Sequence, residues 1–264
     1  MCSQPLAAWT QPQGTAFLKF DNRMSRGDDF HEIDSNSVQI PTLTDYTASL
    51  YAEYGLRDIL TVLGYVPFKR ITLNRQVGRP SGFVYFVGDS VTGLGDAQIG
   101  LRYQLLSLGA TRASLEAPLG DDTQSNGLLT GDGEVNQSVH LLLGHSLYPV
   151  PAYAGISVGF NNRVDGYSDE LHFAAEVGYS IGSRWQVGLQ VRALESLENG
   201  ADSVTGSMGG LFANDQTQWA YGPHVSCSIA GYSLGLGLEG SARSHNAVSA
   251  PAISLSISTL VSGS

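Results

Sequence analysis

Charged side chains occur at every second position in several stretches of this sequence. Lys19, Asp21 and Arg23 follow this spacing near the start of the chain, and Arg112 and Glu116 follow it in residues 110–119. Residues with this spacing point to the same side of an extended chain. Acids and bases on one side of neighbouring strands can form ion pairs or line a hydrated path, because an enclosed charge needs a partner or water. The pattern therefore predicts either an ionic network that supports the structure or a row of charges that orients a solute.

Catalytic chemistry has little support in the sequence. A hydrolase site needs a serine, a histidine and an acid that come together in space, yet no Gly-x-Ser-x-Gly motif and no paired-carboxylate motif is present. The histidines are scattered along the chain: His31, His140, His145, His172, His224 and His245. We therefore expect no catalytic residues, although a lipid-modifying enzyme remains a competing class.

Metal ligands are not indicated by the spacing of residues either. Cys2 and Cys227 form neither a disulfide framework nor a metal-binding spacing. Residues 131–134, Gly-Asp-Gly-Glu, are faintly similar to a calcium loop, but their spacing does not match the EF-hand pattern. We expect no metal and no cofactor.

Strands of one repeated type must position the charged residues. Residues 171–181 alternate apolar with polar or small side chains, a Gly-Ser-Arg turn follows, and residues 185–193 resume the alternation. This pattern predicts a β-hairpin with one apolar face and one face that carries Glu176 and Arg192. In a soluble sandwich the apolar face would form the core. In a membrane barrel it would contact lipid, and the polar face would line the lumen.

The order of short and long connections favours the barrel. About twelve segments show the alternation, each near the ~9–11 residues with which a tilted strand crosses a bilayer. Short connections near Arg57, Leu108, Pro149, Ser183 and Ala230 alternate with longer ones around Glu32, Phe83, Gln124, Gly166, Asp202 and His245. Outer-membrane barrels alternate turns and external loops in this way. We predict an all-β protein, a closed antiparallel up-and-down transmembrane β-barrel of about 12 strands.

Composition agrees with a membrane barrel. Only 14% of residues are charged, against about 25% in ordinary soluble domains. The net charge of −10 argues against a nucleic-acid partner, because phosphate contacts need clustered Lys and Arg. No apolar run approaches the ~20 residues of a membrane helix, so a chain that spans the membrane would have to be a closed barrel.

The polar faces of the predicted strands supply the candidate residues of the lumen. These lumen-lining candidates are Lys19, Asp21, Arg23, Glu53, Asp96, Arg102, Arg112, Glu116, His140, Glu176, Arg192 and Glu239. We predict that Arg102 pairs with Asp96 or Glu116, and that Arg192 pairs with Glu176. Such a network either fills a narrow barrel and holds it shut or leaves a narrow hydrated path.

Three aromatic residues in a long connection are candidates for a gate at the outer mouth. Phe83, Tyr85 and Phe86 lie in residues 74–93. They could fold into the lumen as a plug or cap the rim, where loops usually lie.

The beginning of the chain differs from the rest. Residues 1–8 are similar to the small-residue end of a secretory signal, without the charged and apolar regions that precede such an end. We interpret them as the residual end of a signal peptide or as a disordered N-terminus. Residues 9–264 then form a single β-barrel domain.

Three segments resemble a known family. They are YGLRDILTVLGYVPF (54–68), GLGDAQIGLRYQLL (93–106) and TGDGEVNQSVHLLLG (130–144). They are similar to Gram-negative outer-membrane proteins labelled transporters of the meta-pathway of phenol degradation. The likeness covers roughly residues 15–192, and its motifs are Gly-Asp turns and a strand Val-Pro. The resemblance implies a barrel and the passage of small, often aromatic compounds.

These observations lead to one expected function and two alternatives. We expect an outer-membrane, porin-like channel for passive uptake of small, aromatic or hydrophobic solutes through a narrow charged lumen. Its partners would be that small-molecule solute, outer-membrane lipid and lipopolysaccharide. The alternatives are a plugged structural or adhesive outer-membrane barrel and a lipid-modifying barrel enzyme.

Overall fold

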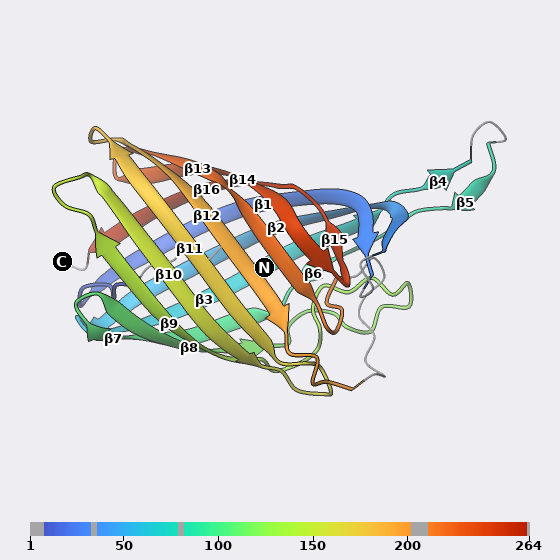
Figure 1. The fold of residues 1–264 in the computed structure, drawn as a ribbon, viewed down its shortest axis with the longest axis horizontal. Coiled ribbons are helices and arrows are strands. Elements are labelled where there is room, and N and C mark those ends of the chain that lie inside the picture. Colours follow the sequence, from blue (N-terminus) through green and yellow to red (C-terminus); the bar gives the residue numbers. More distant parts are fainter. Residues whose placement is uncertain (1–7, 33–35, 79–81, 202–210, 263–264) are drawn as a thin grey trace.

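Twelve strand positions close into an antiparallel barrel (Figure 1). The computed structural model describes residues 8–32, 36–78, 82–201 and 211–262. The main sheet has 14 strands, because β6 and β7 share one position in the wall and β15 and β16 share another. The predicted fold class is therefore confirmed.

The wall strands follow one another in chain order, and β4 and β5 lie outside the wall. Their bounds are β1 Thr15–His31, β2 Ser37–Arg57, β3 Leu60–Leu73, β4 Gln76–Val77, β5 Val84–Phe86, β6 Asp89–Leu94, β7 Ala97–Leu106, β8 Gly109–Ala117, β9 Gln137–Ser146, β10 Ala152–Asn162, β11 Glu170–Ile181, β12 Trp185–Ser196, β13 Thr217–Ile229, β14 Tyr232–His245, β15 Ala247–Ser249 and β16 Ala252–Ser262. Each wall strand pairs with the next, and β1 pairs with β16 from Thr15↔Ser262 to Ser25↔Ala252. That last pairing closes the barrel and leaves no open edge.

The alternation of side chains is inverted relative to a soluble protein. Leu189 on β12 is 59% exposed and Ile99 on β7 is 62% exposed, both on the outer face. Asp21 and Arg102, on the inner face, are 7% and 0% exposed. An outer surface of this kind is stable only against hydrocarbon, as in membrane barrels. No helix in the described part of the chain is long and apolar enough to cross a membrane.

Short turns gather at one end of the barrel, which we call the turn end, and the long connections gather at the other, the loop end (Figure 1). The β13–β14 turn has Ala230 and Gly231 at φ 50° and 84°, the pair of positive φ values that a two-residue type I′ hairpin requires. Gly182 in the β11–β12 turn has φ 63°. These turns set the antiparallel register of their hairpins.

The first two strands are longer than the sequence pattern suggested. The sequence predicts a longer connection around Glu32, yet β1 continues to His31 and β2 begins at Ser37. The polar extensions pair with each other, for example Phe30 with Val38 and Asp29 with Gln39. Backbone pairing in water does not need apolar side chains, so these strands extend beyond the apolar band.

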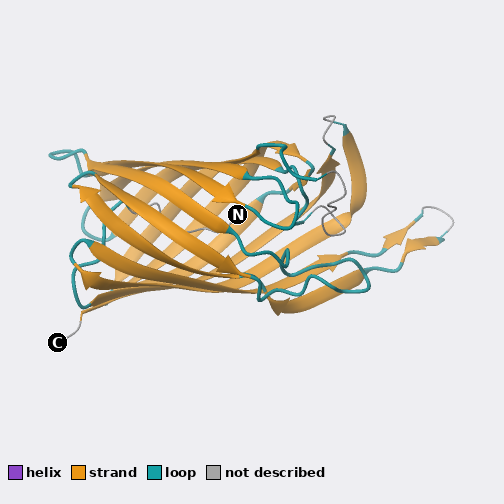
Figure 2. Ribbon diagram, turned by 90° about the horizontal axis from the view of Figure 1, so that it is seen from below, coloured by secondary structure: helices purple, strands orange, loops and turns teal. Residues whose placement is uncertain are grey.

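Beyond the loop end, β4 and β5 form a separate two-stranded hairpin that projects away from the barrel (Figure 2). It leaves the wall after β3 and returns to it at β6. The barrel wall itself therefore does not depend on this hairpin.

The inverted faces lead to a test at two neighbouring positions of β12. We expect Leu189→Arg to destabilise the folded barrel by about 2–4 kcal/mol, because it places a cation against hydrocarbon near the middle of the strand. Gln190→Arg, one residue on, points into the lumen near Glu239 and should be far better tolerated. Urea titration of both variants in liposomes measures the difference, and equal losses would contradict the assignment of the two faces.

Candidate functional site

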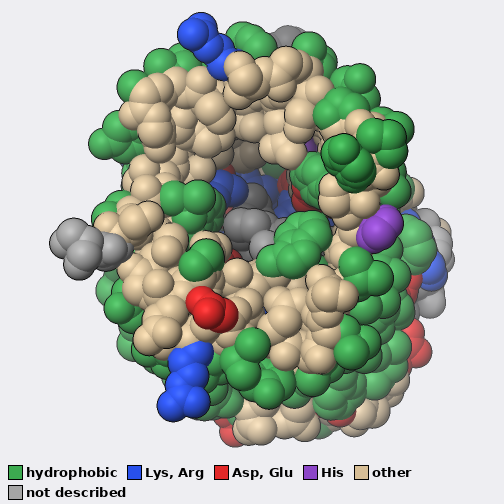
Figure 3. Space-filling model, turned by 90° about the vertical axis from the view of Figure 1, so that its left-hand side faces the viewer, with side chains coloured by type: hydrophobic (Ala, Val, Ile, Leu, Met, Phe, Trp, Pro, Cys, Tyr) green, Lys and Arg blue, Asp and Glu red, His purple; other side chains and the backbone are tan. Residues whose placement is uncertain are grey.

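The inner face of the barrel encloses a cavity of about 400 Å³. Eight of the twelve predicted lumen residues line it: Asp21, Arg23, Asp96, Arg112, Glu116, His140, Arg192 and Glu239. Lys19, Glu53, Arg102 and Glu176 lie on the same inward face, closer to the turn end. Seen from the turn end, the barrel is hollowed, with acidic and basic side chains visible inside (Figure 3). That these residues contact a solute stays a prediction.

Short ion pairs hold many of the charges on the cavity wall. Lys19 Nζ lies 3.3 Å from Asp21 Oδ1 on β1. Lys69 Nζ on β3 lies 3.4 Å from Asp45 Oδ2 on β2, and Asp45 is 7% exposed. In each pair the acidic and the basic side chain neutralise each other, as enclosed charges require.

Glu239 on β14 joins two arginines from opposite sides. Arg23 Nη2 on β1 is 3.2 Å from Glu239 Oε2, and Arg192 Nη2 on β12 contacts Glu239 Oε1. The predicted pair of Arg192 with Glu176 is therefore wrong. Ala220 stands opposite Arg192 on the intervening strand, and its small side chain lets the guanidinium reach β14. Glu176 instead accepts a hydrogen bond from the hydroxyl of Tyr153.

Arg102 and Glu53 form a fully buried pair near the turn end. The Nη1 and Nη2 groups of Arg102 donate to both carboxylate oxygens of Glu53 at 3.0 and 2.9 Å, and the two residues are 0% and 2% exposed. The predicted partners Asp96 and Glu116 are wrong. Asp96 stands six residues along the strand from Arg102, a distance of about 20 Å, whereas small Thr61 on β3 lets Arg102 cross to β2.

The same pair binds a segment that precedes the first strand. Arg102 Nη1 donates to the carbonyl of Trp9 at 3.1 Å, and Gln11 Nε2 donates to Glu53 Oε2 at 2.8 Å. The backbone N–H of Gln11 donates to Thr61 Oγ1 at 2.8 Å. Residues 8–11 thus lie inside the barrel, against β2, β3 and β7, and residues 12–14 continue past the β2–β3 turn at the turn end.

The start of this segment packs into the wall. Ala8 is 0% exposed and forms a small apolar cluster with Ala110 and Leu142. Gly144 on β9 has no room for a Cβ atom beside Ala8 and Trp9. The expected residual signal or disordered N-terminus covers residues 1–8, and its residues 1–7 lie outside the described residues.

A long connection reaches across the loop end. Residues 118–136 join β8 to β9, yet Leu128 is buried in an apolar cluster with residues of β2, β3, β6 and β15. Its neighbours there are Leu43, Ile71, Leu73, Val91 and Val248. The connection therefore covers part of the outer end of the cavity.

Arg163 anchors this connection from the one that follows β10. Its guanidinium lies 3.2 Å from Asp132 Oδ2 and 3.0 Å from Glu170 Oε1, and it also contacts Glu134. Burial raises the pKa of Glu134 to about 8, with Asp132 acting in the same direction and Arg163 against it. Carboxyl groups outnumber basic groups in this part of the lumen.

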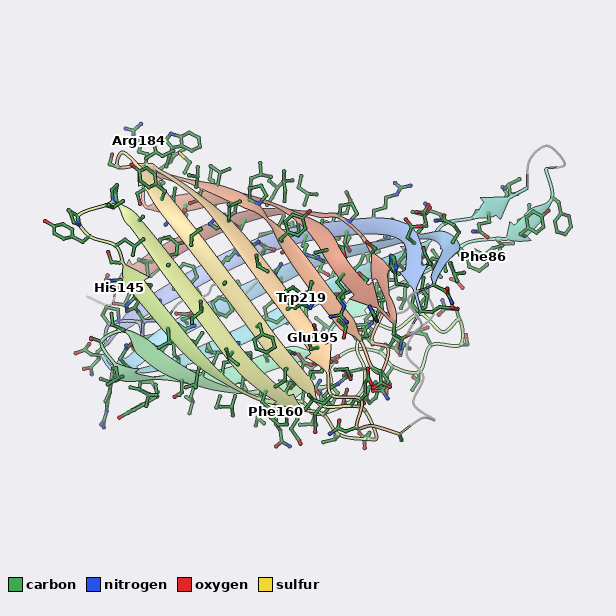
Figure 4. The ribbon with its side chains drawn as sticks, in the orientation of Figure 1. Phe86, His145, Phe160, Arg184, Glu195 and Trp219 are labelled. Atoms are coloured by element: carbon green, nitrogen blue, oxygen red, sulfur yellow. The ribbon has the colours of Figure 1, made fainter. Side chains whose placement is uncertain are left out.

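The predicted gate residues lie outside the barrel mouth. Phe83 and Tyr85 are 62% and 69% exposed on the projecting hairpin, with their rings 5.0 Å apart. Phe86 lies at the base of the hairpin (Figure 4) and packs against the apolar cluster around Leu128. None of the three narrows the cavity in this conformation, and their gating role stays a prediction.

The sequence pattern missed several residues of the site. Asp45 lies on β2 in the same alternation as the candidate Glu53, so the pattern could have included it. Lys69 follows Pro67 on β3, and a proline obscures the alternation of a strand because it removes a hydrogen-bond donor from the ladder. Arg163 and the segment 8–14 lie outside regular alternation, so no periodic signal identifies them.

Comparison with known proteins shows the fold. No protein-family profile and no curated protein matches this sequence. An outer-membrane channel from Pseudomonas putida F1 matches with a TM-score of 0.74 and 15% identity, over 98% of this chain and 99% of that one. The NanC porin matches with a TM-score of 0.53 and 11% identity, over 92% and 98% of the two chains.

A third match is a TodX deltaS2S3 mutant, a monoaromatic hydrocarbon channel, with a TM-score of 0.50 and 11% identity over 96% of this chain and 91% of that one. The chain therefore has the fold of outer-membrane channels and porins. At these identities the likeness establishes the fold alone.

The buried pair of Arg102 and Glu53 yields a prediction about stability. Arg102→Met leaves the Glu53 carboxylate buried without its partner and should cost about 3–5 kcal/mol. The double variant Arg102→Met/Glu53→Gln leaves no unpaired charge and should lose clearly less. Urea unfolding followed by tryptophan fluorescence measures both, and equal losses would show that the two charges are not coupled.

Proposed function

We propose that this protein is an outer-membrane channel through which small solutes pass passively along the barrel lumen. The observation that carries the proposal is a cavity of about 400 Å³ lined by charged and polar residues, inside a barrel with an apolar exterior. Twelve strands lie between eight-stranded barrels, whose interiors are filled, and open porins of ~16–18 strands. A narrow path is the geometry expected between them.

The lining of the cavity favours a small aromatic or hydrophobic solute. Leu43, Tyr65, Leu142 and Leu194 line the cavity beside the ion pairs. Apolar surface of this kind contacts the body of a solute, and the paired charges orient its polar substituents. The similarity to meta-pathway transporters and the monoaromatic hydrocarbon channel among the similar folds support the same solute class.

In the half of the barrel nearer the turn end, the proposed path runs beside the segment 8–14. This segment contacts β2, β3, β7 and β9. The opposite wall, formed by β14 and β16, presents only small inward residues at this level, Gly235, Gly237, Ser254 and Ser256. We propose that the narrow path passes between the segment and this wall.

The membrane is the second partner. The outward rows of leucine, valine and aromatic side chains contact acyl chains of the outer membrane. Lipopolysaccharide, which forms its outer leaflet, would contact the loop end. We propose no catalytic role and no nucleic-acid partner.

A plugged structural barrel is the second candidate, and the segment 8–14 is the observation that favours it. Its hydrogen bonds to Glu53, Thr61 and Arg102 would hold it across the lumen and close the barrel at the turn end. The two candidates differ in whether solutes pass the segment, and conductance measures this directly.

We expect the wild-type protein to conduct ions in a planar bilayer, and a small aromatic solute to reduce that current while it occupies the lumen. Removal of residues 8–13 should raise the conductance several-fold, because it widens the lumen at the turn end. Ser256→Trp should lower it, because the indole fills the path on the opposite wall. Gln11→Ala, which removes only the bond to Glu53, provides a milder variant if the deletion impairs folding.

One result would contradict the channel, and another would contradict the path proposed for it. A wild-type protein that stays silent, together with a deletion variant that also stays silent, supports the structural barrel. Equal conductance of the wild type and Ser256→Trp would show that the current does not use the path beside the β14–β16 wall.

A further inference from the structure

Two arginines near the loop end point away from the lumen, on the lipid side of the wall. Arg26 on β1 shares the alternation of Met24, and Arg70 on β3 shares the alternation of Phe68. Met24 and Phe68 are 43% and 47% exposed on the outer face, and both arginines are exposed as well. The apolar rows of these two strands therefore each end in a cation.

The two arginines flank the same strip of β2. The strands β1, β2 and β3 stand side by side in the wall (Figure 1). Arg26 stands opposite Thr44 on β2, and Arg70 stands opposite Tyr46. Two strand spacings of ~4.8 Å and two residue steps of ~3.4 Å place the Cα atoms of Arg26 and Arg70 about 12 Å apart. Both side chains can therefore contact one headgroup that lies over this strip.

Neither guanidinium has an ion pair or a hydrogen bond with another residue in the described part of the chain. Arg243 differs, because it stands opposite Trp219 at the same end of the barrel and its Nη1 lies 3.4 Å from Glu195 Oε1. Asp29, further along β1 from Arg26, accepts a hydrogen bond from a glutamine of β2. Arg26 and Arg70 are thus available to an external anion.

Aromatic side chains mark the depth of the two arginines in the membrane. Tyr46 and Phe68 are 40% and 47% exposed on the outer face, and aromatic residues form girdles where hydrocarbon meets water in membrane barrels. Leu50 pairs with Val66 nearer the middle of the wall, within the apolar band. The arginines therefore lie at the level of the lipid headgroups, where the stem of the side chain covers apolar surface and the charge stays hydrated.

Hydroxyl groups surround the two guanidinium groups on this face. Thr72 on β3 stands opposite Thr44, and Thr92 on β6 stands opposite Arg70. A threonine hydroxyl donates a hydrogen bond to an anionic oxygen, and a guanidinium donates two in parallel. This set of donors suits a group with several anionic oxygens, such as a phosphate.

The neighbouring apolar band indicates which molecule carries the phosphate. Arginine binds phosphate oxygens in a bidentate geometry, and the surface directly below Arg26 and Arg70 is apolar. A phosphorylated glycolipid matches both features, because its phosphates lie at headgroup level and its acyl chains extend along the apolar rows. Lipid A, the lipid part of lipopolysaccharide, has this chemistry. Free inorganic phosphate matches only the polar half of the surface.

We propose that Arg26 and Arg70, with Thr44 between them, form a binding site for the phosphate groups of lipid A on the outer face of β1, β2 and β3. The site holds one glycolipid of the outer leaflet against the wall at the loop end. It rests on the orientation of the proposed function, with the loop end outward, and not on the passage of a solute. Lipid binding and ion conductance are therefore separate results.

Native mass spectrometry of the full chain tests the site. The protein is refolded from inclusion bodies into detergent, which excludes native lipopolysaccharide, and is then titrated with lipid A. We expect the wild type to hold a single lipid A. The double variant Arg26→Gln/Arg70→Gln should bind it at least about tenfold more weakly, because it loses charge-assisted hydrogen bonds to the phosphates. Each single variant should lose part of this affinity, and heat-modifiable gel migration shows that the variants are folded.

Arg57→Gln/Arg184→Gln is the matched control. Arg57 and Arg184 are exposed at the turn end (Figure 4), so this variant loses the same charge at the opposite side of the membrane. It should bind lipid A like the wild type. Dephosphorylated lipid A should bind more weakly than lipid A, and an excess of inorganic phosphate should displace little of the bound lipid, because it lacks acyl chains.

Three outcomes would overturn the site. The first is equal lipid A affinity of Arg26→Gln/Arg70→Gln and Arg57→Gln/Arg184→Gln. The second is a wild type that binds dephosphorylated lipid A as tightly as lipid A, which would leave the phosphates without a role. The third is complete displacement of lipid A by inorganic phosphate, which would indicate a site for a free anion and not for a glycolipid.

Discussion

Hydrogen bonding of the backbone in a medium without water is the constraint on which this structure depends. A strand edge in hydrocarbon would leave N–H and C=O groups without partners at a cost of several kcal/mol each. Eleven residue pairs between β1 and β16 remove that edge. Closure then gives the sheet an outside and an inside, and the outward rows of Leu189 and Ile99 meet lipid because nothing else covers them.

Closure also makes the interior polar, and an enclosed polar interior must neutralise its own charges. Arg102 with Glu53, and Arg23 and Arg192 with Glu239, meet this requirement across strands that are not neighbours in the wall. The same groups then hold the segment 8–14, since the guanidinium that pairs with Glu53 also binds the Trp9 carbonyl. Neutralisation of charge and narrowing of the lumen are therefore one arrangement.

Local pattern and tertiary contact differ in how well the sequence predicts them. The facing of Asp21, Arg102 and Glu239 followed from alternation alone, because successive side chains of a strand point to opposite sides whatever surrounds them. The partners of Arg102 and Arg192 were predicted wrongly, because neighbouring strands were taken as the only source of partners. Small residues, Thr61 and Ala220, let long side chains cross a whole strand, and that depends on the three-dimensional register.

The all-β class, the approximate number of strands and the facing of most charges could be predicted from the sequence, since these depend on a two-residue period and on the lengths of connections. Which charges meet depends on the folded barrel. Arg23 and Glu239 are 216 residues apart in sequence and adjoin through barrel closure. Asp96, Glu116 and Asp132 are separated in sequence, yet the folded connection 118–136 brings one carboxylate oxygen of each within 4.8 Å of the others.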